Sequence, residues 1–314
     1  MSSTRATGNA ILCSLLEELG IRVVFGLPGG ESVGLFEELR KSALRTILTV
    51  DERAAAFMAN GYYRAAGAPA AVVVSSGPGF TNTLTGLAEA RHDSAALVCL
   101  AIGFGFFPEK KFRLQVVDQP AMSAPVVKAA FQVDRAEDLA RTISEAYAVA
   151  VSGEPGPVLV ETNRGVLAQR AEFSRQELQH QAADSAPAEK LIGELVDYLA
   201  PDRRVVLYAG QGAAGAANEV RLLAEYLHCP VLTSGSARAV IPENHPLSFY
   251  YDFSWGSGGE TINRLITQSD VVLALGIKFT HNGTRGFQLQ IPAEKLVHID
   301  ASSEVLGANY PAAL

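Results

Sequence analysis

Cysteine is scarce in this 314-residue chain, which has only Cys13, Cys99 and Cys229. The three are far apart and each has apolar neighbours. A disulfide framework needs paired cysteines, and a structural metal site needs closely spaced ligands, so the sequence indicates neither. We predict that the three cysteines are small core residues and that the protein is cytoplasmic.

Basic tracts and long apolar runs are also missing. The formal net charge is −7, and no Lys/Arg cluster offers a surface that follows a phosphate backbone, so nucleic-acid binding is not predicted. The longest apolar runs, residues 68–74 and 271–277, are too short to cross a bilayer as helices. They are typical of buried parallel strands, and the first eight residues lack the apolar core of a secretory signal. We therefore expect no membrane association.

The length and the order of elements predict two domains. Apolar segments typical of strands alternate with amphipathic helices in both halves, which favours an α/β fold of two doubly wound, mainly parallel-sheet domains. The sequence becomes polar after about residue 165. We place the first domain at residues 1–168, a linker at 169–187 and the second domain at 188–314.

The most informative stretch surrounds Glu52. A β-rich segment, residues 44–50, leads into Asp51-Glu52, and an alanine-rich helix that ends near Gly67 follows. Ligands collect at the carboxyl ends of strands in open α/β sheets. Glu52 either complements the helix dipole, as acidic residues in first turns commonly do, or is desolvated enough to stay protonated and donate a hydrogen bond to a ring nitrogen.

Two glycine-rich turns flank this stretch in the sequence, at residues 26–30 and 76–79. Each follows a predicted strand and precedes a predicted helix. Both are compatible with plain βα turns, and Ser32 is placed to cap the helix after the first. Phosphate binding at the second turn is an alternative, because glycines before a helix N-terminus commonly form anion sites.

Four motifs occur in one characteristic order: VFGLPGG at residues 24–30, DERAA at 51–55, GYYRAAG at 61–67 and SGPGFTN at 76–82. This order resembles the N-terminal half of thiamine-diphosphate enzymes of the acetolactate synthase and pyruvate decarboxylase superfamily. The resemblance implies that Glu52 bonds N1′ of the aminopyrimidine of thiamine diphosphate and promotes the proton transfer that activates the thiazolium carbon. It also implies that residues of the two turns border that ring, namely Pro28, Gly29, Gly30, Gly77, Pro78, Gly79 and Asn82.

The segment after the fifth predicted strand bears on the type of reaction. Residues 103–108 contain no histidine where decarboxylases of the pyruvate type carry a pair, so a general acid for simple aldehyde release is missing from this loop. Residues 114–128 resemble the acetolactate synthase pattern instead, and Gln115 matches a glutamine near the reacting carbon. Such an amide orients an acceptor carbonyl without titrating. A surface glutamine is the alternative.

The second half contains a G-x-G-x-x-G pattern at residues 210–215, between a predicted strand and a predicted helix. The acidic residue expected after the next strand is absent, which argues against nicotinamide binding. The position also matches the family's central domain, which holds FAD in acetolactate synthases. FAD is doubtful here, because two motifs of that domain are replaced, by FTHN at 279–282 and FSWGSGG at 253–259. Arg285 lies nearby, and His281 fits a loop residue better than a site residue.

Family members normally continue with a third domain that binds Mg²⁺ and the diphosphate through Gly-Asp-Gly, a triplet that this chain lacks. The sequence offers no metal ligands of its own. The resemblance implies that a separate subunit supplies that domain, in a heterotetramer or larger assembly that acts on a small 2-keto acid. Plain decarboxylation, a non-catalytic scaffold, an inactive remnant or fragment, and a nucleotide-binding oxidoreductase remain alternatives.

Overall fold

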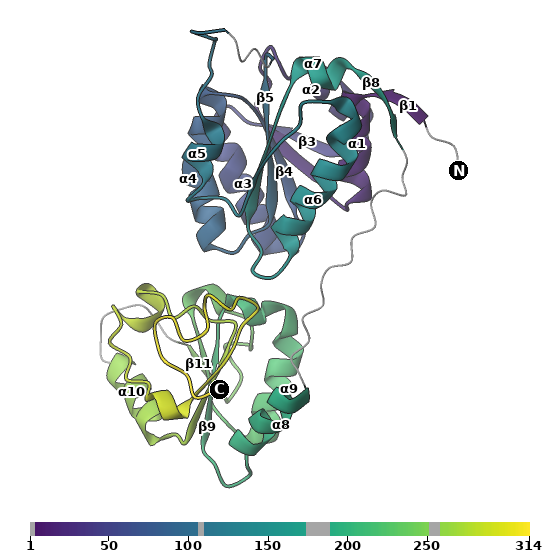
Figure 1. Ribbon diagram of the computed structural model, residues 1–314. Helices are drawn as coiled ribbons and strands as arrows, with labels where there is room; N and C mark the ends of the chain where they lie inside the picture. Colours follow the sequence, from purple (N-terminus) through teal and green to yellow (C-terminus); the bar gives the residue numbers. More distant parts are fainter. Residues whose placement is uncertain (1–3, 106–109, 174–188, 251–257) are drawn as a thin grey trace. The chain divides into compact units, whose positions relative to one another are not determined.

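The computed structural model describes residues 4–105, 110–173, 189–250 and 258–314. The chain divides into two compact units, Met1–Asp184 and Ser185–Leu314 (Figure 1). Each unit is built on its own sheet. None of the described helices combines the length and hydropathy that a membrane crossing requires.

The first unit contains a six-stranded parallel sheet in the order β3-β2-β4-β5-β7-β6. Its strands are β2 (Val23–Gly26), β3 (Arg45–Leu48), β4 (Ala70–Ser75), β5 (Leu97–Gly103), β6 (Ala130–Gln132) and β7 (Pro157–Asn163). The helices are α1 (Gly8–Glu18), α2 (Val33–Lys41), α3 (Glu52–Ala66), α4 (Pro78–His92), α5 (Gln119–Ser123), α6 (Leu139–Val151) and α7 (Arg164–Ala168).

Helices cover both faces of this sheet, as a doubly wound fold requires. Strand β4 has apolar side chains on both faces: Val73 belongs to one apolar cluster, and Val72 and Val74 belong to the other. Both faces therefore need a covering layer. Helices α1, α2, α6 and α7 contribute to the first cluster, and α3 and α4 contribute to the second. A strand buried on both faces reads as a continuous apolar run, which is why residues 68–74 signalled it in the sequence.

The start of the segment predicted as a linker has regular structure. Residues Arg170–Phe173 form strand β8, which pairs antiparallel with β1 (Thr4–Thr7) as a second small sheet of the first unit. The antiparallel ladder satisfies the backbone of a polar segment, and Ala171 and Phe173 are buried beneath it. The rest of the predicted linker, including His180, lies outside the described residues.

The second unit contains a five-stranded parallel sheet in the order β11-β10-β9-β12-β13. Its strands are β9 (Val205–Ala209), β10 (Val231–Thr233), β11 (Ser248–Tyr250), β12 (Val271–Leu275) and β13 (Leu296–Ile299), and its helices are α8 (Glu189–Tyr198), α9 (Ala217–Leu227) and α10 (Gly258–Gln268). Separate apolar clusters fill its two faces. The prediction of two doubly wound, mainly parallel-sheet domains is confirmed.

The three cysteines are free and buried, as predicted. Burial raises the pKa of Cys13 and of Cys99 to about 12 and that of Cys229 to about 11. These thiols therefore stay protonated at neutral pH and behave as small apolar residues.

Candidate cofactor site around Glu52

The first sheet reverses its strand order between β2 and β4. From β2 the chain goes to β3 on one side and then returns to build β4 and β5 on the other. The turns after β2 and β4 therefore meet at a topological switch point, where ligands bind in open α/β sheets. These are the two glycine-rich turns that the sequence singled out.

Glu52 enters this region as the first residue of α3, directly after the strand-end segment. The Asp51 side chain caps the helix by accepting from the Arg53 N–H at 2.8 Å, and Gly67 ends the helix in the left-handed region at φ 65°. The local sequence thus fixes where the helix begins and ends. The position of Glu52 at a strand end and in a first turn matches the prediction.

The Glu52 carboxylate is half-buried and only partly engaged. Its Oε2 atom accepts a hydrogen bond, at 3.0 Å, from Nδ2 of Asn82, which lies near the start of α4. Oε1 accepts no hydrogen bond from the described residues. Asn82 is itself exposed, so the pair is open on one side, and one carboxylate oxygen is left to contact a ligand. The desolvation considered for Glu52 is partial in this structure.

Glycines bring the backbone of the second turn close to the carboxylate and the backbone of the first turn close to Ser75, at the end of β4. A Cβ atom added to Gly79 would lie 3.2 Å from Oε1 of Glu52 and 3.1 Å from Cβ of Ser75. One added to Gly29 would collide with the Ser75 hydroxyl. Ser75, the last residue of β4, therefore touches both turns, and neither glycine can carry a side chain without displacing its neighbours. A flat ring can approach the backbone where side chains are missing.

Ser32 does not cap α2 as predicted. Its hydroxyl turns back, accepts from the Gly29 N–H at 2.9 Å and donates to the Gly29 carbonyl at 3.2 Å. This fixes the first turn instead of the helix end. Pro28 and Gly30 are exposed on the same turn.

A buried polar chain that the sequence did not predict holds the second turn. The Gly77 N–H donates to Oε1 of Gln119 at 2.8 Å, and Nε2 of Gln119 donates to Glu161. Gly77 has φ 71°, a conformation that glycine adopts without strain. Burial raises the pKa of Glu161 above its usual range, an effect that the Gln119 hydrogen bond opposes. The sequence offered only a weak indication of this hydrogen-bonded chain, namely a glutamate at the end of a predicted strand.

Gln115 lies against this turn through its backbone. A Cβ atom on Gly77 would collide with the Gln115 carbonyl oxygen, and Gln115 adopts φ 58° with an exposed side chain. The structure thus brings Gln115 close to the glycine turn, while the role predicted for its amide stays a prediction. Of the aromatic residues in the preceding loop, Phe106 and Phe107 lie outside the described residues.

Several exposed apolar side chains lie close to Glu52 in the sequence. Val50, just before Glu52, is 98% exposed, and Leu48 is 63% exposed. Phe57 and Met58, on α3, are also exposed. Exposed apolar side chains at the end of β3, in the segment after it and on α3 are compatible with a surface that another protein covers.

In the second unit, by contrast, backbone hydrogen bonds within the protein occupy the N–H groups of the glycine turn. Its G-x-G-x-x-G segment forms a 3₁₀ helix, Gln211–Ala216, in which the Gly212 N–H donates to the Gly276 carbonyl at 3.0 Å and Ala213 N–H donates to Gly210. These N–H groups are therefore not free to hold a phosphate. His281 is exposed against Phe287, and residues 253–257 of the second replaced motif lie outside the described residues.

Comparison with known protein families matches these two units separately. Residues 6–122 match the N-terminal TPP-binding domain of thiamine pyrophosphate enzymes, and residues 192–314 match the central domain of the same enzymes. The chain carries these two domains. Thiamine pyrophosphate is another name for thiamine diphosphate, so the match agrees with the resemblance of the four motifs.

Relatives of the chain are acetolactate synthase subunits. The isozyme 1 large subunit of Escherichia coli is 32% identical over 308 residues, covering 96% of this chain and 54% of the relative. A probable large subunit of Methanocaldococcus jannaschii is 30% identical over 313 residues, covering 96% and 52%. The acetolactate synthase of Mycobacterium bovis is 32% identical over 311 residues, covering 96% and 50%.

The chain therefore spans about half the length of the relatives it matches. It is homologous to acetolactate synthase large subunits and has the N-terminal and central domains of a thiamine-diphosphate enzyme. Within the described residues, no group of three or more His, Cys, Asp or Glu side chains could hold a metal ion.

Proposed function

We propose that this chain is one subunit of a heteromeric enzyme that uses thiamine diphosphate to decarboxylate a 2-keto acid and to ligate the resulting acyl unit to a carbonyl acceptor. The observation that carries the proposal is the Glu52 carboxylate at the switch point of the N-terminal domain. One of its oxygens is unengaged among the described residues, and it is bordered by the side-chain-free Gly79.

The residues at this point fit an aminopyrimidine. Oε1 of Glu52 is placed to exchange a proton with a ring nitrogen, and the Asn82 amide keeps the other oxygen in position. Gly29 and Gly79 let the ring reach the backbone. When bound, thiamine diphosphate supplies the nucleophilic carbon and the electron sink for loss of carbon dioxide. Gln115, beside the second turn, is our candidate for orienting the acceptor carbonyl.

We propose that a second polypeptide completes the site. The exposed apolar side chains of Leu48, Val50, Phe57 and Met58 beside Glu52 support a partner surface here. The partner would supply Mg²⁺ and the groups that bind the diphosphate, in a heterotetramer or larger assembly in the cytoplasm. FAD in the central domain is not part of the proposal, because the glycine turn there is closed by its own hydrogen bonds.

The test is gentle purification of the chain from its native source, followed by mass spectrometry of co-purifying polypeptides and assay of bound cofactor. The proposal predicts a stoichiometric partner that carries Gly-Asp-Gly, with thiamine diphosphate and Mg²⁺ in the complex. A cofactor-free complex, or thiamine diphosphate content that does not depend on this chain, would indicate a scaffold. Equilibrium dialysis with labelled nicotinamide cofactor tests the oxidoreductase alternative.

A further inference from the structure

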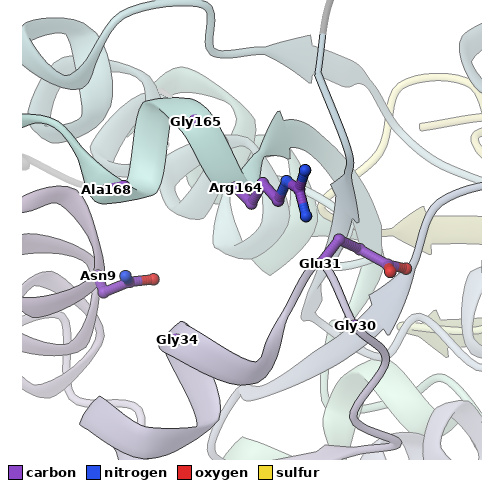
Figure 2. Close-up of a pocket in the computed structure, with 7 residues that line it drawn as sticks. All are labelled: Asn9, Gly30, Glu31, Gly34, Arg164, Gly165 and Ala168. Carbon is purple, nitrogen blue, oxygen red and sulfur yellow. The ribbon is translucent and has the colours of Figure 1, made fainter.

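The two glycine turns of the N-terminal domain are held in different ways. The first is fixed from within, because the Ser32 hydroxyl bonds to Gly29. Figure 2 shows Gly30 of this turn beside a cavity of about 360 Å³ that α1 and α7 also line. The second turn is tied to a distant element, since its Gly77 N–H donates to Gln119, 42 residues further along the chain. Its position therefore depends on where Gln119 is held.

Gln119 is a buried amide that has one favourable orientation. The residue is 2% exposed and begins α5. Its Oε1 atom accepts from the Gly77 N–H at 2.8 Å, while its Nε2 atom donates to Oε1 of Glu161. Turning the amide over would set two donors against each other at Gly77 and two acceptors against each other at the Glu161 carboxylate. The two neighbours therefore fix the amide between them.

Glu161 anchors this hydrogen-bonded chain to the sheet. It lies in β7, where it is paired with Ala101 of β5 on one side and with Gln132 of β6 on the other. Its carbonyl oxygen also accepts the Val133 N–H at 2.8 Å. Backbone held in two ladders is among the last parts of a domain to open, so Glu161 gives Gln119 a fixed point.

A second contact joins the same segment to the same turn. A Cβ atom on Gly77 would collide with the carbonyl oxygen of Gln115, so the two backbones are in close contact. Both residues have a positive φ, 71° at Gly77 and 58° at Gln115. Residues 115–119 are thus joined to the second turn twice, through packing at Gln115 and through the hydrogen bond at Gln119.

The turn leads directly to the Glu52 carboxylate. Gly79, two residues after Gly77, is the glycine whose added Cβ would lie 3.2 Å from Oε1 of Glu52. A shift of Gly77 therefore moves the backbone that borders this oxygen. Because Gln119 holds Gly77 and the same segment carries Gln115, one buried amide determines how the turn and the segment are placed against each other.

We propose that Gln119 is a positioning residue, which aligns the turn beside Glu52 with the segment that carries Gln115, and that Glu161 sets the orientation of the Gln119 amide. The bound thiamine ring and the acceptor carbonyl are then aligned through one hydrogen-bonded chain. This inference rests on the proposed function, and it adds two residues that act through the turn rather than on the substrate.

Hydrogen exchange at the Gly77 N–H measures the chain directly. It is followed by mass spectrometry with residue-resolving fragmentation, on the full chain with any partner that co-purifies and without added thiamine diphosphate. Gln119→Met keeps the length of the side chain but removes both hydrogen bonds, so exchange should become about tenfold faster. Gln132→Met is the matched control and should exchange as the wild type does, because Gln132 also donates to a carboxylate, that of Asp134 at 2.8 Å, but is exposed.

A charge swap separates the hydrogen-bonded chain from simple packing. Gln119→Glu can still accept from the Gly77 N–H, but it sets a second carboxylate against Glu161, so exchange should be about tenfold faster at about pH 8. Adding Glu161→Gln to this variant rebuilds the chain in reverse, because the new amide donates to the new carboxylate. The double variant should exchange within about threefold of the wild type.

The pH profile of the single variant is a further signature of the chain. Burial, and to a smaller extent the charges of Asp118 and Asp134, raise the pKa of Glu161, and the Gln119 hydrogen bond opposes them. Gln119→Glu removes that opposition and adds a charge, so the two carboxylates should share a proton as the pH falls. Protection of the Gly77 N–H, corrected for the intrinsic rate, should therefore recover at about pH 6 in Gln119→Glu and stay constant in the double variant.

The assembled enzyme provides the functional readout. Gln119→Met should weaken thiamine diphosphate binding by about tenfold and raise the KM for the acceptor by about tenfold, because small misplacements of reacting groups are costly. The charge swap should restore both values. In a Gln115→Ala background the effect of Gln119→Met on the acceptor KM should disappear, since Gln119 acts on the acceptor through Gln115.

Unchanged exchange at Gly77 in Gln119→Met would overturn the inference, as would a charge swap that restores neither exchange nor cofactor binding. If Gln119→Met does not fold, Gln119→Glu decides, and equal protection at the two pH values overturns the inference. The failure of the proposed function looks different. The expected exchange pattern in a complex that never holds thiamine diphosphate would keep the hydrogen-bonded chain and refute the enzyme. Thiamine-diphosphate-dependent turnover with wild-type KM and cofactor affinity in Gln119→Met would refute the positioning role alone.

Discussion

The two domains share a doubly wound parallel sheet, yet their switch points differ. In the N-terminal domain, beside the turn after β4, Oε1 of Glu52 accepts no hydrogen bond from the described residues. In the central domain the turns after β9 and β12 close on each other, because Gly212 bonds to Gly276 directly. Glycines serve both places: in the first they lie against Ser75, Gln115 and Glu52, and in the second against the neighbouring turn.

This difference teaches that a glycine-rich turn at a strand end does not by itself indicate a binding site. Backbone N–H groups have protein partners in the turns of both domains, so what separates the two is the side chain of Glu52, whose Oε1 accepts no hydrogen bond from the described residues. The predictions below test this contrast, starting with the largest expected effect.

Glu52→Gln should lower turnover of the assembled enzyme by about 100-fold or more, because an amide cannot cycle a proton at the ring nitrogen. The measurement is steady-state turnover at saturating 2-keto acid and thiamine diphosphate. Glu145→Gln, on exposed α6, is the control. Near-normal turnover of Glu52→Gln would remove Glu52 from the chemistry.

Gly276→Ala should destabilise the central domain by about 2–4 kcal/mol, through strain and overpacking together. Gly276 has φ 56°, and its Cβ would lie 2.6 Å from Cα of Gly212. Gly307→Ala is the matched control, because Gly307 has φ 69° with nothing within 4 Å. Chemical denaturation followed by a probe in the central domain gives both values, and equal losses would show that the turns are not tightly packed.

Gly79→Ala should weaken thiamine diphosphate binding by about tenfold, because one methyl group in a binding site costs this much when it displaces the ligand. The added Cβ lies 3.2 Å from Oε1 of Glu52. Stability should fall as well, because the added Cβ would also lie 3.1 Å from Cβ of Ser75, which is held in β4. Gly61→Ala on α3, where a Cβ meets nothing within 4 Å, is the control. A binding loss shared by Gly61→Ala would refute the local explanation.

Asn82→Ala should reduce turnover by about fivefold, because the 3.0 Å hydrogen bond that orients the Glu52 carboxylate is exposed and therefore modest. Thr85→Ala, one turn further along α4, should have no effect. Asn82→Asp places a second negative charge beside Glu52 and should be worse than Asn82→Ala. The reverse order would show that Asn82 does not act through Glu52.

The smallest expected effect concerns pH. Because burial raises the pKa of Glu161 in the folded chain, the stability that Glu161 contributes is present at low pH and is lost as the pH rises through that raised pKa. Glu161→Gln cannot titrate and so does not lose this stability. The melting temperature of the variant minus that of the wild type should therefore increase from pH 4 to pH 8. A constant difference would show that Glu161 does not titrate with a raised pKa.

Much of the fold could be predicted because the central strands of its sheets are buried on both faces. The apolar run at residues 68–74 predicted a buried strand, and β4 spans Ala70–Ser75, while Asp51 and Gly67 mark the two ends of α3 as local chemistry dictates. Strands β1 and β8 could not be predicted, because their polar residues give no apolar pattern and their pairing joins the two ends of the domain. Long-range backbone pairing of this kind leaves no local signal.

The sequence predicted which residues belong to the candidate site, but it did not predict the hydrogen bonds between them. Sequence motifs located Glu52, Asn82 and the glycine turns, yet the free Oε1 atom of Glu52 is visible only in three dimensions. Gln119 was missed because a buried amide that bonds to a turn has the same local sequence as an exposed one. The closed turn of the central domain was equally hidden, since its G-x-G-x-x-G spacing does not show which N–H groups already have partners.

The most direct test of the central claim is a cryo-EM or crystal structure of the native assembly loaded with thiamine diphosphate and Mg²⁺. We predict that a nitrogen of the aminopyrimidine lies within hydrogen-bonding distance of Oε1 of Glu52, between the turns at Gly29 and Gly79. An aminopyrimidine bound elsewhere, with Glu52 still bonded only to Asn82, would contradict the account.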